Sequence, residues 1–117
     1  MKNSFEAFEI SCKKMLPKGE VTAKSSRFLS FKNPILNNAG IIGYIEIEVD
    51  YSDSKIKPYS IRLKASIRNN SFLENGENYE FLTNEISDRE INSLLNKLRQ
   101  NPKYESLYLS TMKSKYW

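Results

Sequence analysis

Two runs of alternating apolar and polar residues lie near the middle of the chain, within residues 41–68. The apolar positions are Ile45, Ile47, Val49 and Tyr51 in the first run and Ile61, Leu63, Ala65 and Ile67 in the second. A period of two in residues that are largely β-branched is typical of strands buried on one face only. Residues 52–59 between the runs are rich in turn-forming residues, so we predict an antiparallel hairpin whose apolar face is the centre of the core.

The polar positions of this hairpin are acidic on the first strand and basic on the second. Pairing Arg62 with Asp50, or with Glu48 two residues away, places opposite charges across from each other in either case. Charge therefore leaves two registers open, whereas a slip of one residue is excluded because it would turn the apolar face outward. The charged face is either a docking stripe for a partner or an ordinary solvated face with weak ion pairs.

Apolar residues at helical spacing predict a helix at residues 4–16 near the N-terminus. Its stripe contains Phe5, Phe8, Cys12, Met15 and Leu16. Pro17 and Gly19 then end the pattern. We interpret Cys12 on this stripe as a small core residue and not as a reactive thiol.

A second helix is predicted at residues 86–100. Ser87 and Glu90 have the spacing of a capping box, which satisfies free N–H groups at a helix start. The apolar stripe that follows consists of Ile91, Leu94, Leu95 and Leu98. Residues 102–114 favour a further helix, although the alternation of Leu107 and Leu109 would also suit a strand.

Weaker patterns predict a strand at residues 27–31 beside the hairpin and another at 79–83, with turns at 33–34, 37–40 and 74–78. The length of 117 residues suits one domain, residues 1–117. The predicted fold class is α+β. An antiparallel sheet of three to four strands, built around the central hairpin, packs against an N-terminal helix and one or two C-terminal helices.

The chain contains no histidine and a single cysteine, Cys12. Ser-His-Asp and Cys-His catalysis are therefore excluded within one chain, and the usual His/Cys zinc sites fail as well. Carboxylates, lysines and tyrosines remain available, but no spacing singles out a catalytic pair. We expect no enzyme activity, no catalytic residues, no metal and no cofactor.

No run of 18 apolar residues is present, so we expect no membrane-spanning segment. The N-terminal residues carry charges where a signal peptide needs an apolar region. One cysteine fits a reducing compartment, so we expect the protein to be cytoplasmic.

The net charge is +4, but its distribution is uneven. Residues 1–40 contain seven basic and three acidic side chains, whereas residues 74–90 contain six acidic side chains and one basic side chain, Arg89. Separated charges of this kind steer partners, and terminal aromatic residues are frequent binding anchors. The candidate partner-binding residues are Glu74, Glu77, Glu80, Glu85, Asp88, Tyr116 and Trp117. In the alternative interpretation, the acids are a solvated loop plus a helix start, and the two aromatics latch onto the core.

A nucleic-acid groove is a second way to use the basic N-terminal part of the chain. Its candidate residues are Lys24, Arg27 and Lys32 with the aromatic Phe28 and Phe31. The basic residues form no dense run, and no single-strand-binding signature is present. We therefore do not expect direct nucleic-acid binding.

Small proteins without catalytic groups usually act by contact, so we rank a protein-binding module first. The chain resembles the immunity proteins of bacterial contact-dependent growth inhibition (polymorphic toxin) systems. The resemblance lies in small size, a helix-flanked antiparallel sheet and a composition rich in Asn, Ile, Lys and Ser, and not in a motif. It implies an antitoxin that binds a cognate toxin, often a nuclease, and blocks its active site. The alternatives are a phage-encoded inhibitor of a host defence nuclease and a small nucleic-acid-binding regulator.

Overall fold

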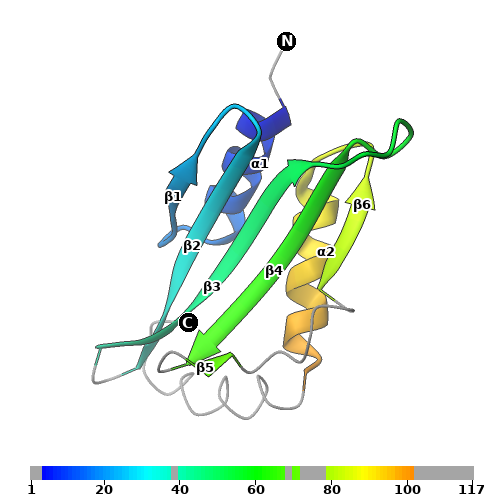
Figure 1. The fold of residues 1–117 in the computed structure, drawn as a ribbon. Helices are drawn as coiled ribbons and strands as arrows, with labels where there is room; N and C mark the ends of the chain where they lie inside the picture. The colour runs from blue at the N-terminus through cyan, green and yellow to red at the C-terminus, as the bar shows by residue number, and fades with distance from the viewer. Residues whose placement is uncertain (1–3, 38–39, 68–69, 72–78, 102–117) are drawn as a thin grey trace.

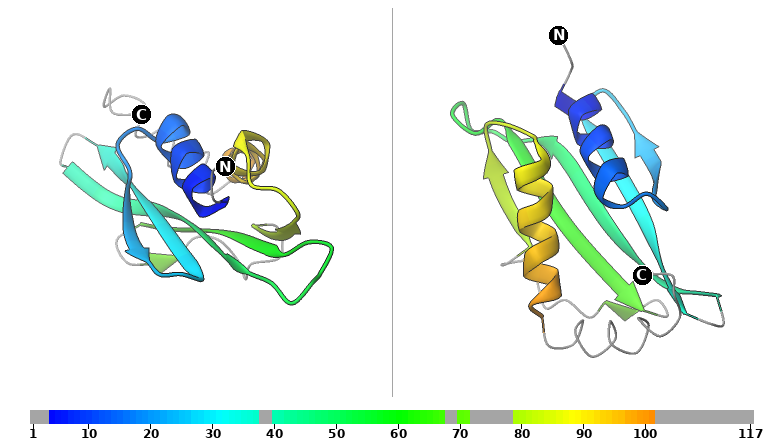
Figure 2. Two further views of the ribbon diagram at one scale, coloured as in Figure 1. Left: turned by 90° about the horizontal axis from the view of Figure 1, so that it is seen from above. Right: turned by 180° about the vertical axis from the view of Figure 1, so that it is seen from behind.

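The computed structural model describes residues 4–37, 40–67, 70–71 and 79–101. In chain order the elements are α1 (Ser4–Met15), β1 (Glu20–Lys24), β2 (Phe28–Asn37), β3 (Gly40–Tyr51), β4 (Tyr59–Ile67), β5 (Asn70–Ser71), β6 (Glu80–Thr83) and α2 (Asp88–Arg99). The strands form one antiparallel sheet, and both helices pack on the same face of it (Figures 1 and 2). The described part of the molecule therefore has two layers, one of strands and one of helices.

The predicted α+β class is confirmed, but the expected three to four strands were too few. The strands lie in the order β1-β2-β3-β4-β5, and β6 pairs with the first half of β4, while β5 pairs with its last residues. Two of these strands were not predicted. β1 is mostly exposed and has a bulge between Val21 and Ala23, so it lacks the apolar alternation that marks a strand. β5 is only two residues long.

The hairpin of β3 and β4 is present, and its register is one of the two that charge left open. Glu48 lies opposite Arg62, and Glu46 lies opposite Lys64. Tyr51 pairs with Tyr59 at the end of the hairpin, where their rings lie 5.8 Å apart. The observed register is therefore the one that pairs Glu48 with Arg62 and leaves residues 52–58 as the connection.

The prediction of a turn at residues 33–34 was wrong, because β2 continues through Pro34 to Asn37. Pro34 lies opposite Tyr44 of β3. On the other side of β2, the pairing with β1 ends at Lys32. Proline lacks an N–H, and it is tolerated in a strand where that group would face away from a neighbouring strand. The short reach of β1 therefore permits a strand longer than the predicted one at 27–31.

The core lies between the inner face of the sheet and the two helices. The most deeply buried side chains are Phe8 and Cys12 from α1, Leu29, Phe31 and Ile35 from β2, Ile45, Ile47 and Val49 from β3, Ile61 from β4, and Ile91, Leu94 and Leu98 from α2. Burial of each large apolar side chain contributes about 1.5–3 kcal/mol relative to leaving it exposed. The predicted core stripe of α2 is confirmed, since its four apolar residues are all buried.

The two helices begin and end close to their predicted limits. At the start of α2, the Glu90 carboxylate accepts hydrogen bonds from the Ser87 N–H at 3.0 Å and the Ser87 hydroxyl at 2.6 Å. In α1, Cys12 is fully buried, as predicted. Desolvation raises the pKa of its thiol, and the nearby charge of Glu9 acts in the same direction. Cys12 is therefore a core residue and stays protonated. The further helix expected at 102–114 lies outside the described residues.

Candidate functional site

The side of the sheet turned away from α1 and α2 is called the open face below. It is the side that Figure 1 presents to the viewer, and no helix of the described residues covers it. Strand residues alternate between the two faces, so the positions next to buried core residues point outward. The charged residues on the open face are Glu20 from β1, Lys32 from β2, Glu46, Glu48 and Asp50 from β3, Arg62 and Lys64 from β4, and Glu80 from β6.

Glu48 lies at the centre of the open face and is only 8% exposed. Its Oε1 accepts a hydrogen bond from Arg62 Nε at 3.1 Å, and Lys64 Nζ lies 3.2 Å from the same oxygen. The two cations come from the neighbouring strand, and their side chains are 36% (Arg62) and 56% (Lys64) exposed. A carboxylate with little access to water is thus neutralised by two cations, and this fixes the positions of all three side chains.

A second group of charges lies beside this centre, on β1, β2 and β3. Lys32 lies between Glu20 on one side and Glu46 on the other in the strand registers. Its Nζ is 4.2 Å from the centroid of the Tyr44 ring, which is within range for a cation–π interaction. Tyr44 and Lys32 therefore form one mixed aromatic and cationic surface.

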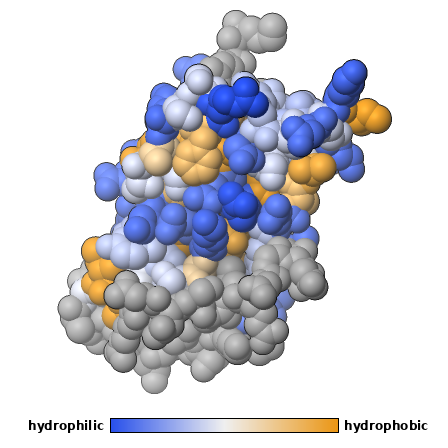
Figure 3. Space-filling view, in the orientation of Figure 1, coloured by the Kyte–Doolittle hydropathy of each residue, from blue (hydrophilic) through white to orange (hydrophobic). Residues whose placement is uncertain are grey.

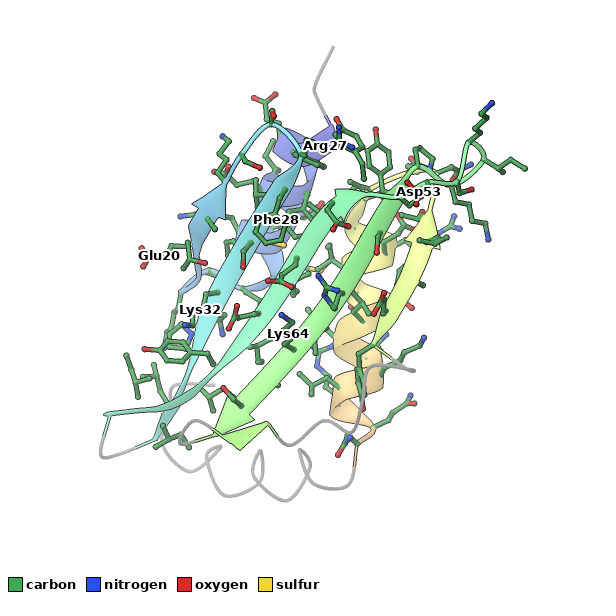
Figure 4. The ribbon with its side chains drawn as sticks, viewed as in Figure 1. Glu20, Arg27, Phe28, Lys32, Asp53 and Lys64 are labelled. Carbon is green, nitrogen blue, oxygen red and sulfur yellow. The ribbon has the colours of Figure 1, made fainter. Side chains whose placement is uncertain are left out.

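The charge of the open face differs in sign from that of the whole chain. Its described residues include five carboxylates and three cations, while the chain carries 18 basic and 14 acidic residues. Figure 3 shows hydrophilic side chains across the middle of this face, with apolar side chains toward its upper end. Figure 4 shows Lys32 and Lys64 on this face, with Glu20 at the β1 edge and Phe28 above them. The face is a mosaic of both signs and not a uniform basic surface.

The connection between β3 and β4, residues 52–58, stands at the upper end of this face (Figure 1). The Ser54 hydroxyl accepts hydrogen bonds from the backbone N–H of Ile56 at 3.3 Å and of Lys57 at 3.0 Å. The Ser52 backbone N–H donates to the carbonyl of Pro58 at 2.8 Å. These bonds hold the loop while leaving Ile56 at its tip 78% exposed. A large aliphatic side chain on an ordered loop is a pre-formed contact point.

The acidic residues that the sequence singled out do not all lie on one surface. Glu80 is exposed on β6 opposite Arg62, so it belongs to the open face. Glu85 is exposed in the connection between β6 and α2. Asp88 belongs to the helix layer. The other predicted positions, Glu74, Glu77, Tyr116 and Trp117, lie outside the described residues.

Asp88 connects the two helices. Its Oδ1 accepts a hydrogen bond from the Ser11 hydroxyl at 2.7 Å, and its Oδ2 lies 2.6 Å from Lys14 Nζ. The hydrogen bond from Lys14, followed by that from Ser11, holds the pKa of the Asp88 carboxyl below its usual value. Asp88 therefore contacts α1, and as a carboxylate in the first turn of α2 it also interacts favourably with the dipole of its own helix.

The residues considered for a nucleic-acid groove do not form one. Phe31 is fully buried in the core, so it cannot stack on a base. Lys24 lies 4.0 Å from Glu9 of α1, and Arg27 lies 5.7 Å from the centroid of the Tyr51 ring. Lys32 stands on the open face with carboxylates on both sides. A groove lined only by cations and aromatic rings is absent from this part of the described chain.

The sequence predicted which charged residues of the hairpin lie on the open face, but it did not predict that residues of β1 and β2 join them. Glu20 and Lys32 join the face because β1 exists and because β2 runs past its predicted end. The alternation of Phe28, Ser30 and Lys32 with buried residues was the signal for this, interrupted by Pro34.

Within the described residues, no group of three or more acidic, histidine or cysteine side chains could hold a metal ion. The helices described here are also too short and too polar to span a membrane. A scan against protein-family models and searches of curated proteins and of solved structures found nothing similar to this chain.

Proposed function

We propose that this chain is a protein-binding module that acts by laying the open face of its sheet against a partner protein. The observation that carries the proposal is the charge mosaic around Glu48, which is ordered before any partner arrives. Arg62 and Lys64 are already held by Glu48, so little side-chain freedom would be lost on binding. A fixed pattern of both signs gives specificity, because a mismatched partner would bring like charges together.

The same mosaic favours a protein over a nucleic acid as the partner. Phosphates would meet the carboxylates of Glu46, Asp50 and Glu80 as well as the cations of the face. Nucleic-acid affinity depends on the neutralisation of phosphates by Lys and Arg, and each carboxylate opposes it. A protein surface can present both signs in the complementary order.

We further propose that the partner is a toxin enzyme, most simply a nuclease, and that the chain is its immunity protein. The support is the resemblance in size, composition and architecture described above. The carboxylate excess of the open face adds to it, because nuclease clefts are basic and attract acidic surfaces. Binding over such a cleft would exclude the substrate without any chemistry by this chain.

A charge swap tests the open face without changing the net charge. Lys32→Glu combined with Glu46→Lys keeps opposite charges at paired positions of β2 and β3 but reverses the pattern that a partner meets, and it places like charges opposite Glu20 and Lys64 on the neighbouring strands. An immunity protein and its toxin are expected to be encoded side by side, so the partner to test is the product of the neighbouring gene. We expect its inhibition to weaken by about a hundredfold or more, as for substitutions at interface hot spots, while the like-charge contacts with Glu20 and Lys64 lower the free energy of unfolding by no more than about 1–2 kcal/mol.

The matched control is the swap of Glu85→Arg and Arg89→Glu, which are exposed residues near the start of α2. It should leave inhibition within about threefold, since substitutions outside an interface core have small effects. If the control weakens inhibition as much as the swap on the open face, the acidic segment and not the sheet makes the contact. If the isolated chain binds RNA or DNA with steep salt dependence, the protein partner is wrong.

A further inference from the structure

A pocket of about 660 Å³ opens between α1 and the turn that joins β1 to β2. It lies in the helix layer and is separate from the open face. Its walls combine the acidic and apolar side of α1, the residues of the turn and the ring at the end of β3. The lining residues used below are Phe5, Glu6, Glu9, Ile10, Lys24 and Tyr51.

The pocket has an aromatic wall and an acidic wall. The rings of Phe5 and Tyr51 lie 5.1 Å apart, and Tyr51 is 46% exposed. Glu6 and Glu9 are three residues apart on α1, so their side chains lie on the same side of the helix. Ile10 adds an aliphatic surface that is 46% exposed. A ligand that suits all of these walls has an apolar stem and a positively charged end.

Two cations of the chain itself already approach these walls. Lys24 Nζ lies 4.0 Å from Glu9 Oε1, and the guanidinium carbon of Arg27 lies 5.7 Å from the centroid of the Tyr51 ring. Both distances are at the outer limit for such interactions, and the Lys24 side chain is 67% exposed. Glu9 and Tyr51 therefore attract cations, and Lys24 and Arg27 are held weakly enough to be displaced from them.

We propose that this pocket binds an arginine side chain presented by a protein. A guanidinium is planar, so it stacks on an aromatic ring and pairs with a carboxylate at the same time, which an ammonium does less well. This inference rests on the proposed function in one respect only, namely that the arginine belongs to a protein. The recognition itself depends on Glu6, Glu9 and Tyr51.

The probe is N-acetyl-arginine-N-methylamide, whose ends are uncharged, and its matched control is the citrulline analogue, which is neutral and nearly isosteric. Titration of the labelled full chain, followed by amide chemical shifts, should show saturable binding of the arginine probe in the millimolar range. The shifts should centre on Phe5, Glu9, Lys24 and Tyr51. Citrulline should bind at least about tenfold more weakly, because it lacks the charge that the carboxylates and the ring recognise.

The variant Glu6→Gln with Glu9→Gln should lose most of the arginine binding and retain the fold. Glu20→Gln with Glu80→Gln removes the same charge from the open face and should leave arginine binding unchanged. Equal binding of the two probes, shifts elsewhere on the molecule, or undiminished binding by the Glu6 and Glu9 variant would each overturn the pocket proposal.

These outcomes are independent of the test of the open face. The swap of Lys32 and Glu46 should still bind the arginine probe. Loss of inhibition in that swap, without arginine binding in the parent chain, would refute the pocket alone. Arginine binding, with inhibition unaffected by the swap, would refute the role of the open face alone.

Discussion

The two faces of the sheet are made by the same strands and differ by a shift of one residue. Phe31 and Ile47 point into the core and are fully buried, while their neighbours Lys32 and Glu46 point outward and carry charge. The inner face is specified by volume and hydrophobicity, whereas the open face is specified by the order of its charges. Stability and recognition are thus assigned to alternate positions, and substitutions should separate them.

The largest expected effect comes from a substitution on the inner face of β2. Phe31→Ala removes a fully buried ring and should lower the free energy of unfolding by about 3–5 kcal/mol. Phe28→Ala, on the same strand but on the open face, should lower it by less than about 1 kcal/mol. Urea denaturation followed by circular dichroism gives both values. Similar losses for the two variants would mean that the faces are not divided as described.

Gly19→Ala should also destabilise the protein through the inner face. Gly19 is buried, and a Cβ at this position would collide with the Phe31 ring and lie 3.0 Å from the Lys32 carbonyl oxygen. Overpacking of this kind costs about 1–3 kcal/mol. Adding Phe31→Leu should relieve part of the collision, so the double variant should lose less stability than the two single losses added together. Simple additivity would contradict this contact.

The hydrophobic pattern was sufficient to predict the inner face but not the open face. Ile47 and Leu63 were assigned to the core because side chains alternate between the two faces of a strand, so the apolar positions of a period-two pattern all lie on the buried face. The charges of the hairpin matched in two registers, so they could not predict whether Arg62 or Lys64 would lie opposite Glu48. The observed register places Tyr51 opposite Tyr59 and leaves residues 52–58 as the connection, a loop length that the charges do not specify.

Other parts of the fold depended on distant segments. Pro34 was expected to end a strand, and it is accommodated only because the pairing of β1 stops at Lys32. Asp88 was considered as a partner-binding acid because residues 74–90 are rich in carboxylates. Its bonds to Ser11 and Lys14 span more than 70 residues of sequence, and no local pattern reports such a pairing.

A smaller effect is expected at the centre of the open face. Glu48→Ala would leave Arg62 and Lys64 close together without the carboxylate that they share, and should cost about 1–2 kcal/mol. Glu46→Ala on the same strand is the control, with an expected change within about 0.5 kcal/mol. Denaturation at low and high salt measures both. A neutral Glu48→Ala variant would mean that the central ion pairs do not order the face.

The smallest effect concerns the contact between the helices and depends on pH. The pKa of Asp88 is lowered below the ordinary value of 3.8 by Lys14 and Ser11, so the folded state favours the charged carboxylate. This contribution is fully present above pH 3.8 and is lost as the pH falls through the lower pKa of the folded state. The melting temperature of Asp88→Asn should therefore lie slightly below that of the parent chain at about pH 6, and the difference should shrink toward about pH 2.5.

Lys14→Gln distinguishes the two partners of Asp88, because it removes the ion pair and leaves the carboxylate at the start of α2. It should reproduce part of the decrease in melting temperature caused by Asp88→Asn. Added salt should make the decrease caused by Lys14→Gln smaller, since the Lys14 side chain is 66% exposed and its ion pair is screened. If Lys14→Gln leaves the melting temperature unchanged at every pH while Asp88→Asn lowers it, the carboxylate acts only on the dipole of its own helix. The two helices would then be joined by their apolar sides and the hydrogen bond from Ser11, without a contribution from the ion pair.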